Sequence, residues 1–150
     1  GRTVRSLCRL LSLYEGVEFF FVAPDDYGMR EDILDDLNAD DIKYTLSKNF
    51  KEIIPQVDAI YSTRLQDEHD KNHESASVNY NGFCFTEEYL NLLKKDAVIL
   101  HPFPRRNEIC VGVDKDPRAL YWKQARNGMW VRMALILKLF RREGEVFNFA

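Results

Sequence analysis

Apolar and polar residues follow one another along this chain in blocks that predict an α/β fold. Near the amino end, apolar residues recur at the i, i+3, i+4, i+7 spacing of a helix with one buried face, which predicts a helix over residues 3–14. Short runs of β-branched and aromatic residues that end at proline or polar positions predict strands. The next predicted elements are a strand at 17–23, a helix at 30–37, a strand at 42–46, a helix at 49–57 capped by Ser47 or Asn49, and a strand at 59–63. This alternation indicates right-handed βαβ units and a parallel sheet.

In the carboxyl-terminal half, one long polar segment interrupts the alternation of predicted strands and helices, which then continues. Residues 64–85 are long, polar and without a consistent period, and a loop of this length inside a domain is usually functional or mobile. A helix is predicted at 86–94 with Thr86 as its N-cap, followed by a buried strand at 97–100. Asp116 and Pro117 form an N-cap and N1 pair that predicts a helix to about residue 126, which Asn127 and Gly128 interrupt. The last predicted helix, 129–142, is apolar around most of its circumference, which is excessive for a surface helix.

The stretch at 97–109, AVILHPFPRRNEI, is the first place to look for chemistry. It predicts a central strand that runs directly into a loop, and in open α/β sheets ligands bind beyond the carboxyl ends of such strands. Each proline restricts its own φ and pushes the residue before it, His101 or Phe103, towards an extended conformation. Backbone carbonyls fixed in this way suit recognition of a small NH2 or NH3+ group. The alternative is a stiff connecting loop with no ligand.

Charge and cysteine usage exclude several classes of function. The 150 residues carry 21 basic and 24 acidic side chains, interleaved to a net charge of −3, so no basic surface for nucleic acid is indicated. No signal peptide and no apolar run long enough to span a bilayer is present in the sequence, and three cysteines without a CxxC pair argue against a disulfide framework or a thiolate zinc site. We therefore expect a cytoplasmic protein. His69 and His73 could be drawn as a metal site, but zinc needs three or four converging ligands, and a solvated loop is favoured.

Four motifs together resemble one enzyme family. They are GRTVRSL at residues 1–7, YSTRLQ at 61–66, HPFPRRNEI at 101–109 and VDKDPRALYWKQARNGMWVRMALI at 113–136. In this order they are similar to the carboxyl-terminal part of aspartate carbamoyltransferase catalytic chains. The resemblance spans nearly the whole chain, and it implies a Rossmann-like, doubly wound parallel sheet that forms a single aspartate-binding domain over residues 1–150.

The resemblance also implies roles for individual residues. Arg2, Arg64 and Gln66 match the family's residues that bind the substrate aspartate, and an arginine guanidinium suits a carboxylate because it offers two parallel hydrogen bonds. Without the family, Arg64 would be read as a surface arginine and Arg2 as a frayed terminal residue. Phe103 and Pro104 match loop residues whose backbone approaches carbamoyl phosphate, with a cis peptide bond between them. The residues expected to support these groups are Glu68, Arg105, Glu108 and Arg132.

The implied reaction is attack of the aspartate amine on the carbonyl carbon of carbamoyl phosphate, which gives N-carbamoyl-L-aspartate and phosphate. Catalysis would come from positioning and charge stabilisation, with no metal and no organic cofactor. The family's carbamoyl-phosphate-binding domain has no counterpart in these residues. The expected partners are thus the two substrates, the missing domain and, in the full-length protein, a homotrimer that can include a regulatory chain, with neither nucleic acid nor membrane.

Two departures and three alternatives accompany this interpretation. Arg5 stands where the family usually has histidine, and residues 67–80 differ from the basic continuation found there. An ornithine-type carbamoyltransferase is disfavoured because the chain shows HPFP and TRLQ at the two diagnostic loops. A non-catalytic module that kept the fold remains open. A dinucleotide-binding domain is disfavoured because no GxGxxG turn occurs.

The sheet itself is expected to be interrupted. The family resemblance places a strand ahead of Gly1, between the pair 17–23 and 42–46 and the pair 59–63 and 97–100. We therefore predict a gap in the strand ladder, or a gap filled by another segment. We also predict that the last helix exposes Trp130, Leu137 and Phe140 and promotes self-association.

Overall fold

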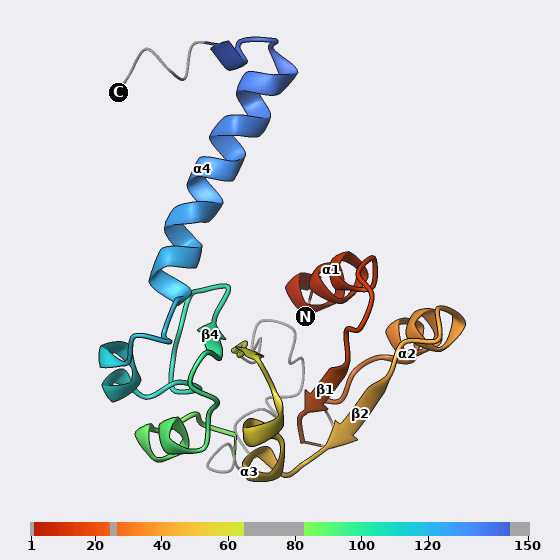
Figure 1. The fold of residues 1–150 in the computed structure, drawn as a ribbon, viewed down its shortest axis with the longest axis vertical. Coiled ribbons are helices and arrows are strands. Elements are labelled where there is room, and N and C mark those ends of the chain that lie inside the picture. Colours follow the sequence, from red (N-terminus) through yellow and green to blue (C-terminus); the bar gives the residue numbers. More distant parts are fainter. Residues whose placement is uncertain (1, 25–26, 65–82, 145–150) are drawn as a thin grey trace, which may run out of the picture.

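The computed structural model describes residues 2–24, 27–64 and 83–144 of the chain, which form two pairs of parallel strands with helices around them (Figure 1). The first pair consists of β1 (Phe19–Val22) and β2 (Tyr44–Ser47), and the helices that accompany it are α1 (Arg2–Leu11) and α2 (Glu31–Ala39). Strands β1 and β2 are parallel, with Phe19 opposite Tyr44 and Val22 opposite Ser47. Their core consists of Cys8, Phe19, Ile33 and Leu37.

The second pair follows in the chain and carries the larger core. It is built from α3 (Phe50–Ile53) with the 3₁₀ turn Ile54–Gln56, β3 (Ala59–Tyr61), the 3₁₀ helix η6 (Glu87–Asn91), β4 (Val98–Leu100), the 3₁₀ helix η7 (Val111–Lys115) and α4 (Tyr121–Leu139). Strands β3 and β4 are parallel, with Ala59 opposite Val98 and Tyr61 opposite Leu100. The buried residues of this core are Ile54, Ile60, Phe85, Leu93, Ala97, Ile99, Ile109, Val113 and Tyr121.

The α/β prediction and the parallel pairing are confirmed. Strands were placed correctly to within two residues at each end, because each apolar run ends where polar residues or proline begin. Within the described residues, no ladder joins β1 and β2 to β3 and β4, so the predicted interruption of the sheet is also confirmed.

The cap predicted for the helix at 49–57 was wrong. Asn49 occupies the N-cap position of α3, but its side chain makes no cap hydrogen bond and its amide donates to Glu52 instead. The Ser47 hydroxyl accepts from the Asn49 backbone N–H at 3.0 Å, ahead of the helix rather than within its first turn. The helix then continues as a 3₁₀ turn through Gln56.

The helix predicted at 86–94 is only the short 3₁₀ helix η6, and Thr86 makes no side-chain cap hydrogen bond. The physical reason lies in Arg118. Its guanidinium donates to the carbonyls of Leu90, Leu93 and Lys94 at 2.9–3.2 Å. Carbonyls that a continuing helix would satisfy internally are thus held by a side chain from elsewhere, and the chain turns into β4.

The predicted helix start at Asp116 and Pro117 was wrong as well. The Asp116 carboxylate binds the backbone N–H and the guanidinium of Arg118, and Ala119 pairs with Ile99 in a parallel bridge beside β4. This segment is therefore a turn, closed by a hydrogen bond from the Ala119 N–H to the Asp116 carbonyl at 3.0 Å and followed by the bridge at Ala119, and α4 begins only at Tyr121. Asn127 and Gly128 do not interrupt α4, because one glycine costs about 1 kcal/mol and the flanking residues continue the backbone hydrogen-bond ladder on both sides.

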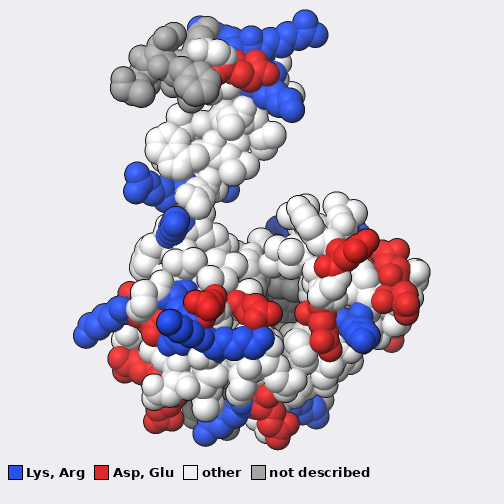
Figure 2. All heavy atoms as spheres, in the orientation of Figure 1, with Lys and Arg blue, Asp and Glu red and all other residues white. Residues whose placement is uncertain are grey.

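Helix α4 stands clear of the remainder of the molecule (Figure 1). Along its middle Figure 2 shows mostly uncharged atoms, with basic groups near its lower and upper ends. Its exposed apolar side chains are Trp122, Met129, Trp130, Val131, Met133, Leu135, Ile136 and Leu139, and Phe140 follows directly. The predicted exposure is confirmed for Trp130 and Phe140, whereas Leu137 is half-buried. None of the helices described is both long and apolar enough to cross a membrane.

Candidate functional site

The carboxyl ends of β3 and β4 meet at one edge, and two predicted site segments follow them directly. Tyr61 pairs with Leu100, and the Ser62 N–H donates to the Leu100 carbonyl at 3.0 Å. Arg64, which is half-buried, lies three residues beyond Tyr61, and loop 101–108 begins immediately after Leu100. Because parallel neighbouring strands end at the same edge, the fold brings Arg64 and this loop to one side of the sheet.

The first anchor of loop 101–108 is the buried His101, only 1% exposed. Its backbone N–H donates to the Gln124 side-chain oxygen at 2.9 Å, and its Nδ1 accepts the Phe103 N–H at 2.9 Å. Because Nδ1 accepts, the neutral ring carries its proton on Nε2 and donates it to Glu108 Oε1 at 2.7 Å. Burial lowers the pKa of His101 more than Glu108 raises it, so the ring is neutral at pH 7.

The second anchor is Arg105. Its guanidinium binds the Asp114 carboxylate through both terminal nitrogens, and it also donates to the Tyr121 hydroxyl at 3.2 Å. The Tyr121 hydroxyl in turn donates to Asp114. The Arg105 hydrogen bond is the main reason that the pKa of Asp114 is lowered, whereas burial, followed by Asp114, raises the pKa of Tyr121 to about 12. Both groups therefore keep one protonation state throughout the neutral range.

Between the two anchors lies Phe103, whose backbone has a positive φ of 56°, so the extended conformation expected for it before Pro104 was wrong. The predicted cis peptide bond between Phe103 and Pro104 is confirmed. The Phe103 ring contacts Trp122 at 4.8 Å, His101 at 5.5 Å and Tyr121 at 5.9 Å between centroids. Loop 101–108 is thus fixed by polar contacts at both ends and by aromatic packing at its middle, as a site that recognises a ligand through backbone groups requires.

Sequence reasoning gave no role to four residues that hold this loop, of which His101 belongs to the loop and the other three lie outside it. His101, Asp114, Tyr121 and Gln124 were seen as parts of motifs or of a helix. A usable signal was present for two of them: Tyr121 and Gln124 lie three apart, one turn of a helix, so that both side chains can face the same loop. Asp114 had no such signal, because its contact with Arg105 depends on the path of η7.

The other predicted site residues are placed as follows. Arg2 is exposed at the first position of α1, and its carbonyl accepts the Ser6 hydroxyl at 3.1 Å. Gln66 and Glu68, like His69 and His73, lie outside the described residues. Arg132 is exposed on α4, eleven residues beyond Tyr121 and so about 16 Å further along the helix axis, which separates it from loop 101–108.

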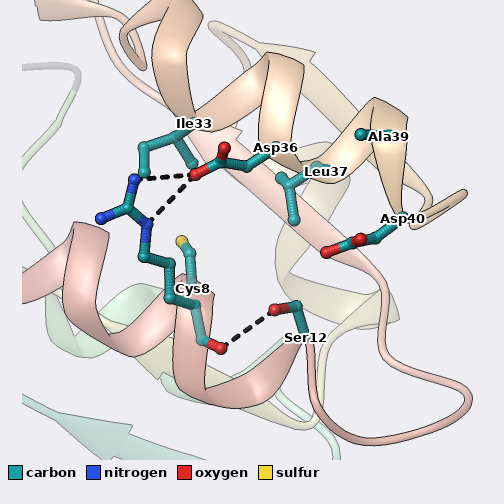
Figure 3. A pocket seen from close by; sticks show the side chains of 8 residues that line it. Cys8, Ser12, Ile33, Asp36, Leu37, Ala39 and Asp40 are labelled. Carbon is teal, nitrogen blue, oxygen red and sulfur yellow. Dashed lines mark hydrogen bonds and ion pairs between the residues drawn. The ribbon is translucent and has the colours of Figure 1, made fainter.

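A separate pocket of about 190 Å³ lies between α1 and α2. Figure 3 shows Cys8 and Ser12 on one side of it and Asp36, Leu37 and Asp40 on the other. Arg9 closes one end with a hydrogen bond to Asp36 at 2.8 Å. Burial raises the pKa of the Cys8 thiol, which disfavours the nucleophilic thiolate. This pocket belongs to the packing of α1 on α2, to which the unusual Arg5 also contributes through its ion pair with Asp32.

Three comparisons place these features among known proteins. The sequence profile described as "Aspartate/ornithine carbamoyltransferase, Asp/Orn binding domain" matches residues 1–139. The chain is 40% identical over 139 residues to the aspartate carbamoyltransferase catalytic subunit of Clostridium kluyveri, covering 93% of this chain and 45% of that one. It is 40% identical over 140 residues to the chloroplastic enzyme of Oryza sativa, covering 91% and 38%.

Solved structures give the same result. The catalytic subunit of M. jannaschii aspartate transcarbamoylase superimposes with a TM-score of 0.85 at 37% identity, covering 94% of this chain and 46% of that one. The Trypanosoma cruzi aspartate transcarbamoylase in complex with carbamoyl phosphate and aspartate gives a TM-score of 0.81 at 32% identity, covering 91% and 46%. The chain therefore spans less than half the length of these relatives.

Proposed function

The chain belongs to the aspartate/ornithine carbamoyltransferase family, and from this premise we propose that it is the aspartate-binding domain of an aspartate carbamoyltransferase. The proposed reaction transfers the carbamoyl group of carbamoyl phosphate to the amine of L-aspartate, which gives N-carbamoyl-L-aspartate and phosphate for pyrimidine synthesis. The relatives named above are aspartate carbamoyltransferases, although the matching profile covers the ornithine enzymes as well.

The observation that carries the proposal is the parallel pairing of β3 and β4, after whose carboxyl ends Arg64 and loop 101–108 follow. In the proposed site Arg64 binds an aspartate carboxylate in two parallel hydrogen bonds, and Gln66 adds a third. Arg2, at the amino end of α1 where the helix dipole favours anions, binds the other carboxylate.

The carbamoyl group is the proposed ligand of loop 101–108. Backbone carbonyls at Phe103 and Pro104 accept hydrogen bonds from its NH2 group and hold its carbon in line with the incoming amine. Arg105 and Glu108 act by holding the loop in place. Arg105 donates a hydrogen bond to the buried Tyr121 hydroxyl, and Glu108 accepts one from the buried His101 ring. Glu68 orients Arg64, and Arg132 supports the site from further along α4 without contacting loop 101–108. No metal or organic cofactor is needed, because the rate gain comes from orientation and from charge stabilisation on the departing phosphate.

The partners of this domain follow from the proposed reaction. The leaving phosphate needs donors, and these come from a carbamoyl-phosphate-binding domain that lies outside these 150 residues. We further propose that the full-length enzyme is a cytoplasmic homotrimer that can bind a regulatory chain, although the plant relatives carry chloroplastic names. The exposed apolar surface of α4 supports burial against another part of the assembly.

The decisive experiment joins this chain to the amino-terminal half of the Clostridium kluyveri enzyme and assays carbamoyl transfer to L-aspartate and to L-ornithine. We expect turnover with L-aspartate and none with L-ornithine. A folded hybrid that prefers L-ornithine would assign the domain to the other branch of the family, and one inactive with both would favour the non-catalytic module.

A second measurement uses the chain as it is. Titration with N-carbamoyl-L-aspartate, followed by backbone amide NMR shifts, is expected to move Arg64 and loop 101–108 and to leave the α1–α2 pocket unchanged. Shifts confined to that pocket would contradict the proposed site.

A further inference from the structure

His101 is a buried titratable group that takes no part in the proposed reaction. Its side chain is 0% exposed, so it cannot touch a ligand directly. Both ring nitrogens are already bonded, since Nδ1 accepts the Phe103 N–H at 2.9 Å and Nε2 meets Glu108 Oε1 at 2.7 Å. Any effect of this ring on a ligand must therefore pass through the residues that it holds.

The ring joins the middle of loop 101–108 to its far end. Its Nδ1 holds Phe103, and its Nε2 reaches the Glu108 carboxylate, whose Oε1 also accepts the Arg106 backbone N–H at 3.0 Å. The backbone of His101 is itself fixed, because its N–H donates to the Gln124 side chain of α4 at 2.9 Å. One imidazole thus connects two parts of the loop at a position that α4 holds in place.

Phe103 is the residue of the loop that most needs such support. Its φ of 56° is one that a bulky residue rarely adopts and keeps only where its surroundings fix it. The hydrogen bond from its N–H to His101 Nδ1 spans two residues and closes the turn. Phe103 is half-buried and Pro104 is exposed, so this part of the loop is accessible to a ligand. The ring nitrogen of His101 thus controls the most accessible turn of the loop.

Only one form of the ring makes both contacts. A backbone N–H always donates, so Nδ1 must lack a proton and Nε2 must carry the one that Glu108 accepts. The opposite tautomer would bring two N–H groups together at Phe103 and would leave Nε2 without a proton beside the Glu108 carboxylate. A doubly protonated ring would keep the contact with Glu108 and lose the one with Phe103.

We propose that His101 is a positioning residue for the carbamoyl group: as the neutral tautomer with its proton on Nε2, it holds Phe103 through Nδ1 and so keeps the carbonyls of Phe103 and Pro104 in place for the ligand. The assignment of this role rests on the proposed function of loop 101–108. Glu108 contributes from the other side of the ring, because the hydrogen bond that one ring nitrogen makes decides which nitrogen carries the proton.

Two substitutions separate the two ring contacts. In His101→Asn, the side-chain oxygen stands as many bonds from the backbone as Nδ1 does, and it can accept the Phe103 N–H. In His101→Gln, the amide nitrogen stands as many bonds from the backbone as Nε2 does, and it can donate to Glu108, but no atom replaces Nδ1. The asparagine variant should therefore keep the turn at Phe103, and the glutamine variant should lose it.

The kinetic test introduces each substitution into the hybrid enzyme described above and varies each substrate in turn. We expect His101→Gln to raise KM for carbamoyl phosphate about tenfold, the size of one lost hydrogen bond, and His101→Asn to raise it by about twofold or less. KM for L-aspartate should stay unchanged in both. Cys8→Ala is the matched control, because Cys8 is buried in the core of α1 and α2, and it should change neither KM. Equal increases for the two His101 variants, or for the two substrates, would overturn the proposal.

Two NMR measurements on the unaltered chain need neither catalysis nor a folded variant at His101. Nitrogen-15 shifts of the His101 ring at pH 7 should show a proton on Nε2 and none on Nδ1, and the Phe103 amide should exchange slowly with solvent. A proton on Nδ1, or a rapidly exchanging Phe103 amide, would overturn the role of His101. A hybrid without turnover whose chain meets both expectations would support the hold of His101 on the loop and count against the proposed function instead.

Discussion

Replacing Asp114 by asparagine will measure how strongly loop 101–108 is held. The carboxylate accepts two hydrogen bonds from the Arg105 guanidinium and one from the Tyr121 hydroxyl. The Arg105 and Asp114 side chains are only 13% and 26% exposed, so solvent screens the pair weakly. Asparagine keeps one acceptor oxygen for Tyr121 but loses the charge-assisted pair, and we expect a loss of about 2 kcal/mol in the free energy of unfolding.

The exposed pair of Lys94 and Asp58 is the matched control. It joins the same two kinds of charge at 2.7 Å, but its side chains are 43% and 87% exposed. Surface pairs of this kind contribute about 0.5 kcal/mol or less, so Asp58→Asn should change the stability little. Urea unfolding of both variants, followed by circular dichroism at pH 7, gives the two values, and unchanged m-values show that the denatured states remain comparable.

The dependence on pH gives an independent check. Arg105 holds the pKa of folded Asp114 below its ordinary value of 3.8. A carboxyl group with a depressed folded pKa contributes stability above its unfolded pKa and loses that contribution as the pH falls through the folded value. The difference between the unaltered chain and Asp114→Asn should therefore be complete at pH 6 and shrink as the pH falls below about 4. Equal losses for Asp114→Asn and Asp58→Asn, or a loss that persists in acid, would refute this account.

Three further predictions concern the proposed function and the surface. In a full-length enzyme that carries this domain, Arg64→Ala should lower kcat/KM for L-aspartate by the equivalent of about 2 to 5 kcal/mol and leave carbamoyl-phosphate binding nearly intact. Steady-state kinetics measure both effects, and equal losses for the two substrates would assign Arg64 a structural role. The isolated 150-residue chain should form no N-carbamoyl-L-aspartate, because the leaving phosphate lacks donors, and turnover close to that of a complete enzyme would contradict this expectation. The chain should also self-associate through the exposed apolar residues of α4, which sedimentation velocity would show as concentration-dependent association. The double variant Leu135→Glu with Ile136→Glu should abolish this association and the distant Leu13→Glu should not, whereas an unaltered chain that stays monomeric at high concentration would contradict the prediction.

The sequence predicted those parts of the fold that short-range patterns determine. Strands β1 to β4 were found because each apolar run is bounded by polar residues or proline, and their parallel order follows from the helices between them. The cis bond before Pro104 was expected from the family resemblance, since the general frequency of cis X-Pro bonds is only about 5%.

The errors arose where a distant side chain competes with a local signal. Asp116 and Pro117 have the composition of a helix start, yet Arg118 binds that aspartate and extends its guanidinium to the end of η6. The contacts of Arg118 thus explain why no helix begins at Asp116 and why η6 is shorter than the helix predicted at 86–94.

Helix α4 has a mechanical consequence for this site. Its first turn supplies Tyr121, Trp122 and Gln124 to loop 101–108, while its remaining turns extend away from the body of the molecule (Figure 1). With 19 residues it is a rigid rod about 28 Å long. A tilt of about 5° at its base therefore moves its far end by roughly 2.5 Å. Conversely, a contact that holds the far end within such a distance restricts the orientation of the first turn, and with it the loop, to a few degrees.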